Sequence, residues 1–187
     1  MSGGRRSVLQ AVLGTSLGLL LPQGAHAQAA DPRNARPREG DHLVYADGDR
    51  KGTLVKLDDL SVGGPPVTAM PQDAASGTVR DGSRLNQIVL VRLDPARLQG
   101  DTQGRAAQGV VAYSAVCTHT GCDGFAWTAE KQMYKCPCHD SEFDPADAAK
   151  VTGGPAPRRL PALPLKIADG LVVVAGTFTA RVGVISN

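Results

Sequence analysis

The chain has 187 residues, of which 42% are hydrophobic and 20% are charged, a composition typical of a soluble globular protein with a buried core. It carries 20 Lys and Arg residues against 18 Asp and Glu residues, so its formal net charge is only +2. This balance gives no electrostatic basis for binding nucleic acid. Glycine (22 residues) and proline (13 residues) are frequent, which favours many turns and short strands.

The N-terminus has the pattern of an export signal. Arg5 and Arg6 precede an apolar run from Val8 to Leu21, and Ala25-His26-Ala27 offers a small-x-small cleavage site. We expect residues 1–27 to be a twin-arginine signal peptide, which would be read by the twin-arginine translocase and would place the folded protein in the periplasm. The alternative is a retained membrane anchor, but the run is shorter than the roughly 20 residues that a spanning helix needs.

The rest of the chain predicts short strands and no long helix. Residues 28–41 lack periodicity and are expected to be a flexible lead-in, followed by one domain over residues 42–187. A tight hairpin is indicated by Asp169-Gly170 between two apolar runs. We predict an all-β fold, an antiparallel β-sandwich base with a smaller subdomain inserted at about residues 115–158. The candidate strands are 42–45, 53–57, 67–70, 87–93, 109–114, 125–127, 133–134, 163–167, 171–175, 177–179 and 181–185.

Two short boxes contain all four cysteines and two of the four histidines. Box 1 is Cys-Thr-His-Thr-Gly-Cys at 117–122, and box 2 is Cys-Pro-Cys-His-Asp-Ser at 136–141. Each box can supply one thiolate and one imidazole, which is the ligand set of a [2Fe–2S] centre with two cysteines on one iron and two histidines on the other. We therefore predict Cys117 and Cys136 as ligands of one iron, and His119 and His139 as ligands of the second.

A zinc site is the alternative that uses the same ligand types. Zinc sites with two cysteines and two histidines usually place a pair of cysteines before a pair of histidines. In this chain Cys and His alternate within each box, and two further cysteines remain. The alternative function at this point is a binding module stabilised by zinc and a disulfide, without redox activity.

The two boxes and the later loop Gly153-Gly154-Pro155-Ala156-Pro157 resemble the Rieske proteins of respiratory chains. The resemblance extends over roughly residues 85–187, and it implies the Rieske fold with one [2Fe–2S] cluster. Two branches of the family are similar: the small Rieske subunit of arsenite oxidase and the Rieske subunit of quinol–cytochrome c reductase. The remaining cysteines, Cys122 and Cys138, lie at matched places in the two boxes, and a disulfide between them would tie the loops together over the cluster.

The resemblance also identifies residues around the ligands that would adjust the cluster's potential. Ser141 matches a serine that bonds a bridging sulfur in the high-potential branch, whereas Phe143 replaces a tyrosine that bonds a ligand sulfur. One hydrogen-bond donor to the sulfurs is kept and one is lost, so we expect a redox potential below that of a quinol-oxidising Rieske protein. Asp140 replaces a common glycine and would raise the pKa of His139 or steer a partner, unless it is merely a solvated loop charge. Gly154 and Pro155 belong to the loop that would cover the cluster.

These residues predict an electron-transfer subunit without catalytic residues of its own. It would take single electrons from a catalytic oxidoreductase subunit and pass them to a soluble acceptor, a cytochrome c or a cupredoxin, as in complexes of the arsenite oxidase type. The alternative from the same family is the membrane-anchored Rieske subunit of quinol–cytochrome c reductase.

Overall fold

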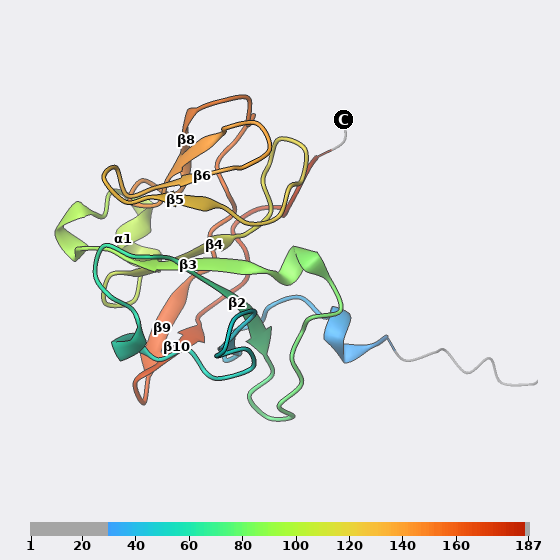
Figure 1. The fold of residues 1–187 in the computed structure, drawn as a ribbon. Helices are drawn as coiled ribbons and strands as arrows, with labels where there is room; N and C mark the ends of the chain where they lie inside the picture. Colours follow the sequence, from blue (N-terminus) through green and yellow to red (C-terminus); the bar gives the residue numbers. More distant parts are fainter. Residues whose placement is uncertain (1–29, 186–187) are drawn as a thin grey trace, which may run out of the picture.

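The computed structural model describes residues 30–185, in which ten strands form two antiparallel sheets (Figure 1). The larger sheet has the order β4-β3-β2-β1-β10-β9 and the smaller one the order β5-β6-β7-β8. The strands are β1 (His42–Tyr45), β2 (Val67–Gln72), β3 (Ile88–Arg92), β4 (Val110–Ser114), β5 (Ala126–Thr128), β6 (Met133–Lys135), β7 (Glu142–Asp144), β8 (Lys150–Gly153), β9 (Leu165–Ala168) and β10 (Leu171–Val174).

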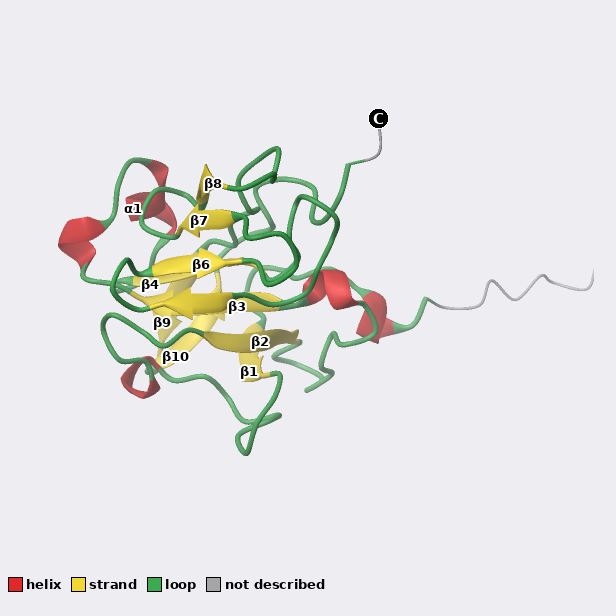
Figure 2. Cartoon of the chain, turned by 45° about the horizontal axis from the view of Figure 1, so that its top comes forward, coloured by secondary structure: helices red, strands yellow, loops and turns green. Residues whose placement is uncertain are grey.

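Helical structure in the described residues is limited to short pieces at the edges of the sheets (Figure 2). Residues 30–185 contain one short α-helix, α1 (Asp101–Arg105), and the 3₁₀ turns η1 (Pro32–Asn34), η2 (Leu57–Asp59), η3 (Arg84–Asn86) and η4 (Pro95–Arg97). No helix in residues 30–185 is both long and apolar enough to cross a membrane. The predicted signal, residues 1–27, lies outside the described residues.

The larger sheet curls until its two ends meet. The segment that leads into β9 runs beside β4, where the Leu163 N–H donates to the Ala112 carbonyl and the Ser114 N–H donates to the Pro161 carbonyl, both at 2.9 Å. The predicted sandwich base is therefore one sheet whose two halves enclose a core. Its buried side chains include those of Leu43, Val55, Leu90, Leu163, Val172 and Val174.

Strands β3 and β4 carry cores on both of their faces. Successive side chains of a strand point to opposite faces, and here Leu90 and Ala112 face the interior of the curled sheet while Val91 and Tyr113 face the smaller sheet. Both faces are covered, which explains why β3 reads as a continuous apolar run instead of an alternating one. The second core joins the base to the inserted subdomain, and it contains the predicted cysteine ligands.

Most of the predicted strands are present. The β9–β10 hairpin turns at Asp169 and Gly170, which both have positive φ angles (50° and 75°), as a tight primed turn requires. Residues 53–57 make only isolated bridges, Leu54 to Val44 and Lys56 to Leu171, instead of the predicted strand. Residues 177–179 and 181–185 also form no strand, whereas β7 and β8 were not predicted.

The described part of the expected flexible lead-in is fastened to the base. Arg80 binds the Asp41 carboxylate with two hydrogen bonds of 2.8 and 2.9 Å, and both side chains are buried. The Asn86 amide donates to the Ala35 carbonyl at 2.8 Å, and the Gly40 N–H donates to the Val174 carbonyl at 2.9 Å. These bonds lie far apart in sequence, so the local composition did not predict them.

Candidate metal centre

Box 1 and box 2 each follow a buried strand and form loops with the same backbone hydrogen bonds. Box 1 follows β4 and box 2 follows β6. The N–H of the first cysteine donates to the carbonyl five residues later, Cys117 to Cys122 and Cys136 to Ser141, both at 2.8 Å. In each loop the fifth residue donates back to the first carbonyl at 3.1 Å. The two loops are therefore copies of one backbone turn.

This shared turn corrects the expectation that the surplus cysteines occupy matched places. Cys122 is the sixth residue of box 1 and aligns with Ser141, whereas Cys138 is the third residue of box 2 and aligns with His119. The fifth residue has a positive φ in both loops, 81° at Gly121 and 57° at Asp140. Asp140 thus occupies a position that glycine fills without strain, and aspartate is one of the side chains that tolerates it.

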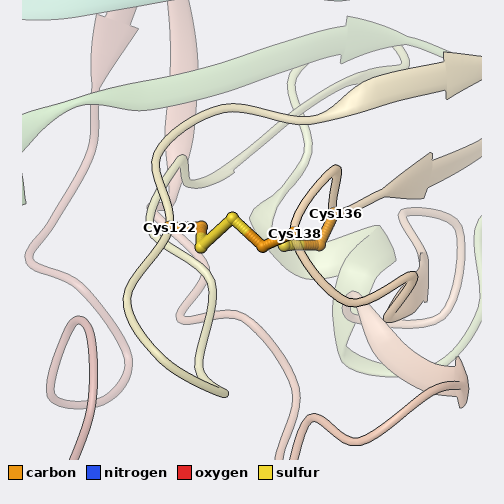
Figure 3. Close-up of side chains that lie close together, drawn as sticks. All are labelled: Cys122, Cys136 and Cys138. Carbon is orange, nitrogen blue, oxygen red and sulfur yellow. A yellow bond between two sulfur atoms is a disulfide. The ribbon is translucent and has the colours of Figure 1, made fainter.

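Cys122 and Cys138 form the predicted disulfide, with a Cα–Cα distance of 6.6 Å. Figure 3 shows the bond joining the loop of box 1 to the loop of box 2, with Cys136 beside it. The sulfurs of these three cysteines lie within 4.8 Å of one another. Because Cys122 and Cys138 are joined in the disulfide, Cys136 is the one member of this group of three whose thiol can bind metal.

The two remaining thiols, Cys117 and Cys136, are buried and unbonded. Burial raises the pKa of the Cys117 thiol and the neighbouring Cys136 raises it further, while the backbone N–H groups of His119 and Thr120 oppose this shift. The pocket thus disfavours a bare thiolate, which a bound metal cation would stabilise. The amides aimed at the Cys117 sulfur are the type of hydrogen bond that adjusts an iron–sulfur potential.

The two histidines of the boxes meet edge to face, with ring centroids 4.8 Å apart and ring planes at 86°. His119 is half-buried, and its Nδ1 atom is buried without a hydrogen-bond partner among the described residues. A buried ring nitrogen without a partner is costly, and metal coordination would satisfy it. His139 is exposed. The arrangement can therefore offer one imidazole from each loop to a common metal ion.

A third loop, residues 153–157, packs against box 2. Ser141 is fully buried, and its hydroxyl accepts a hydrogen bond of 3.1 Å from the Ala156 N–H. The hydroxyl proton remains available for another acceptor. Gly154 has a φ of 77° and lies directly against the Ser141 backbone. Pro155 is exposed beside it. The predicted cover loop is thus held by the same serine that we expect to adjust the potential.

Phe143 and Asp140 have different surroundings. Phe143 is fully buried in the core between the two sheets and meets Phe125 edge to face at 5.5 Å. Asp140 is exposed and forms an ion pair of 3.0 Å with Lys135, and this carboxylate raises the pKa of Lys135. The Asp140 charge is therefore partly compensated by a neighbour that the sequence reasoning did not identify.

Two further side chains, those of Thr118 and Arg84, position box 1 and were missed from the sequence. Thr118 donates from its hydroxyl to the Arg158 carbonyl at 2.6 Å, which joins box 1 to the chain after the third loop. Arg84 of η3 donates to the Gly121 carbonyl at 2.8 Å and to the Asp123 carboxylate at 2.7 Å. Bonds to backbone carbonyls leave no trace in residue spacing, so no sequence motif indicates them.

The comparisons with known proteins identify the family. Residues 67–164 match the family model described as the Rieske [2Fe-2S] domain. The chain is 35% identical over 152 residues to a Rieske subunit named for respiratory nitrate reductase in Haloferax mediterranei, which covers 78% of this chain. It is 37% identical over 98 residues, or 51% of this chain, to the Rieske iron–sulfur subunit of the cytochrome bc1 complex of Streptomyces lividans. The chain belongs to the Rieske [2Fe–2S] family.

The matched region spans 65% and 58% of these two relatives, less than two thirds of either. Among solved structures, the soluble domain of the Rieske protein II from Sulfolobus acidocaldarius has a TM-score of 0.38 and 22% identity, over 51% of this chain and 66% of that chain.

Family membership makes one [2Fe–2S] cluster the cofactor of this domain, and the side chains fit it. The donor set is two buried free thiols and two imidazoles, divided equally between two loops. The unpartnered Nδ1 of His119 is a further sign of a missing ligand bond. The zinc alternative is not supported, because it does not explain the match to the Rieske [2Fe-2S] domain.

Proposed function

We propose that this chain is a one-electron carrier in which Cys117 and Cys136 bind one iron of the cluster and His119 and His139 bind the other. One observation carries this assignment: each of the two loops supplies one buried free thiol and one histidine, and the two histidines meet edge to face. The two loops also share the same backbone hydrogen bonds. The bound cluster would supply reversible one-electron redox chemistry at a potential between about −150 and +300 mV.

The residues of the chain would keep water from the thiolates and expose one imidazole for electron exchange. The thiols are buried, whereas the His139 ring is exposed at the tip of box 2. The disulfide holds the two loops together, and Ser141 anchors the third loop to box 2. A site closed on the cysteine side and open on the histidine side suits electron transfer to a docked protein.

The partner that we propose as electron donor is a catalytic subunit of a respiratory oxidoreductase. This is supported by the names of the relatives, which are subunits of nitrate reductase and of cytochrome bc1 complexes. Phe143 cannot supply a hydroxyl to a ligand sulfur, which favours a potential below that of a quinol oxidant. We propose a complex of the arsenite oxidase type, which the two boxes resemble, with a soluble cytochrome c or cupredoxin as acceptor.

We also propose that residues 1–27 are a twin-arginine signal and that the protein functions in the periplasm, with residues 42–187 as the Rieske domain. The second candidate is the Rieske subunit of a cytochrome bc1 complex. It is favoured by the third loop and by the bc1 relatives. Cleavage after residue 27 in the native host would contradict this candidate, and an intact N-terminus in the membrane fraction would support it.

An EPR-monitored redox titration of the purified protein with its native cluster tests the proposal. We expect a Rieske-type signal with a midpoint in the lower or middle part of the family range. A midpoint near the top of the range that falls with pH around neutrality would favour quinol as donor and the bc1 candidate. Protein without iron, sulfide and a Rieske signal would contradict the proposed function.

A further inference from the structure

A surface beside His119 is formed by residues 157–159 together with the C-terminal segment, residues 179–185. We infer that this surface docks an electron-acceptor protein that presents an acidic face. The surface consists of Arg158 and Arg181, which are neighbours, the exposed Arg159 that follows Arg158 in the chain, and two exposed apolar side chains, Val184 and Ile185. We call these five residues the arginine patch. The inference rests on the proposed function and adds the chemical nature of the acceptor.

The C-terminal segment is held against box 1 by packing and by Arg158. Gly183 is buried where an added Cβ would lie 3.5 Å from Leu85 and 3.7 Å from Val116. The Arg158 guanidinium donates to the carbonyls of Arg181 and Gly183. In Figure 1 the last described residues, in red, run up beside the yellow-green loop that carries box 1. The arginine patch is therefore fixed relative to the metal ligands.

The positive charges of this surface have no carboxylate partner within residues 30–185. None of its three arginines takes part in a salt bridge there. Burial lowers the pKa of Arg158, and the neighbouring positive charge of Arg181 lowers it further. By contrast, Asp123 next to box 1 is paired with Arg84, and Asp140 in box 2 is paired with Lys135. A concentration of like charges without local compensation is best complemented by an acidic partner.

The same surface is hollow and partly apolar. A cavity of about 330 Å³ is lined by Thr118, His119, Pro157, Arg158, Val184 and Ile185. Only three large hydrophobic side chains are exposed in the described residues, and two of them are Val184 (43% exposed) and Ile185 (47%). An apolar centre with a charged rim is the usual anatomy of a protein interface. The cavity can receive a side chain of the partner directly beside a ligand histidine.

Docking here would place the acceptor's redox centre next to His119, whose ring centroid lies 4.8 Å from that of the exposed His139. One electron would pass from the reduced cluster to the acceptor, so the cluster would be oxidised and the acceptor reduced. The overall formal charge of the chain is only +2, so the local patch and not the net charge would steer the encounter. Steering of this kind raises association rates by tenfold to a thousandfold at low salt and is screened as the Debye length falls.

The experiment measures electron transfer by stopped flow from the reduced protein to two probes, an acidic plastocyanin and a basic mitochondrial cytochrome c. Ionic strength is varied from about 10 to 300 mM. The test variant is Arg159→Glu with Arg181→Glu. The control, Lys51→Glu with Lys131→Glu, makes the same charge change at exposed lysines that form no salt bridge in the described structure. Arg158 is left unchanged because it holds the C-terminal segment.

We expect the rate to plastocyanin to fall as salt rises and to drop about tenfold in the test variant at low salt. The control should change the rate by less than twofold, and the test variant should improve the reaction with the basic cytochrome. A further variant, Val184→Ser with Ile185→Ser, should slow plastocyanin reduction equally at all salt concentrations. Rates to plastocyanin that rise with salt, or that fall equally in test and control variants, would overturn the inference.

The cluster is checked independently in every variant by iron content and by its EPR midpoint, and rates are expressed per cluster. Absence of a Rieske signal in the unsubstituted protein would overturn the proposed function itself. A normal signal and midpoint with no effect of the test variant would overturn only the docking inference.

Discussion

Gly154 lies so close to Ser141 that a side chain cannot fit between them. A Cβ added to Gly154 would lie 2.5 Å from the Ser141 Cα and 2.8 Å from the Asp140 carbonyl oxygen, and all of these are backbone atoms. The third loop and box 2 therefore depend on one glycine for their mutual position.

Gly154→Ala should destabilise the protein by about 1–3 kcal/mol and loosen the cluster, because the loop must move away from Ser141. Gly170→Ala is a matched control. Gly170 has nearly the same φ, 75° against 77°, but has no atom within 4 Å of an added Cβ. Thermal unfolding and cluster retention should be affected more at position 154. Equal losses at both positions would show that backbone strain alone is responsible.

Removal of the disulfide should lower stability without removing the metal ligands. The bond closes a sequence separation of 16 residues, for which loop entropy predicts about 3 kcal/mol. We expect the double variant Cys122→Ser with Cys138→Ser to bind iron, to melt at a lower temperature and to lose its cluster faster in dilute solution. The double variant avoids leaving an unpaired thiol beside Cys136. The same melting temperature with and without the disulfide would contradict this prediction.

Hydroxyl groups near the ligands should control the midpoint potential. Ser141→Ala should lower it, and Phe143→Tyr should raise it, because a donated hydrogen bond favours the more negative reduced state. A difference of about 1 kcal/mol between the two oxidation states corresponds to roughly 40 mV for one electron. Redox titration of both variants measures this. An unchanged midpoint in the Phe143 variant would mean that the missing hydroxyl does not set the potential.

The buried ion pair of the lead-in should contribute far more to stability than an exposed one. Arg80 is 3% exposed and binds both carboxylate oxygens of Asp41. Arg80→Met leaves that carboxylate buried with the Arg38 N–H but without its cationic partner, and should cost about 3 kcal/mol. The control is Arg33→Met, which breaks the exposed pair with Asp81. Chemical denaturation should show a large loss for the first variant and a small one for the second.

The chemistry of the site could be predicted because it depends on rare residue types. The spacing of cysteines and histidines alone indicates four ligands, and the structure brings them together in two loops. They are Cys117, His119, Cys136 and His139. The family assignment that followed from them is confirmed by the match over residues 67–164. The ligand roles themselves stay a prediction.

The supporting contacts could not be predicted from the sequence. Arg84 and Arg158 bind backbone carbonyls, and any residue can supply a carbonyl. The unequal places of Cys122 and Cys138 became visible only through the backbone hydrogen bonds of the two boxes. Strands β7 and β8 have only three and four residues, and each contains a single large apolar side chain, Phe143 and Val151, which is too little to show a strand period.

The central claim is that two histidines bind one iron of a cluster held by two cysteines, and pulsed EPR tests it most directly. The protein would be expressed with nitrogen-15 histidine, reduced, and compared with protein carrying natural nitrogen. We predict a [2Fe–2S] signal coupled to two histidine nitrogens, and loss of that pattern in His119→Cys and in His139→Cys. A cluster signal with no coupling to histidine nitrogen would contradict the account.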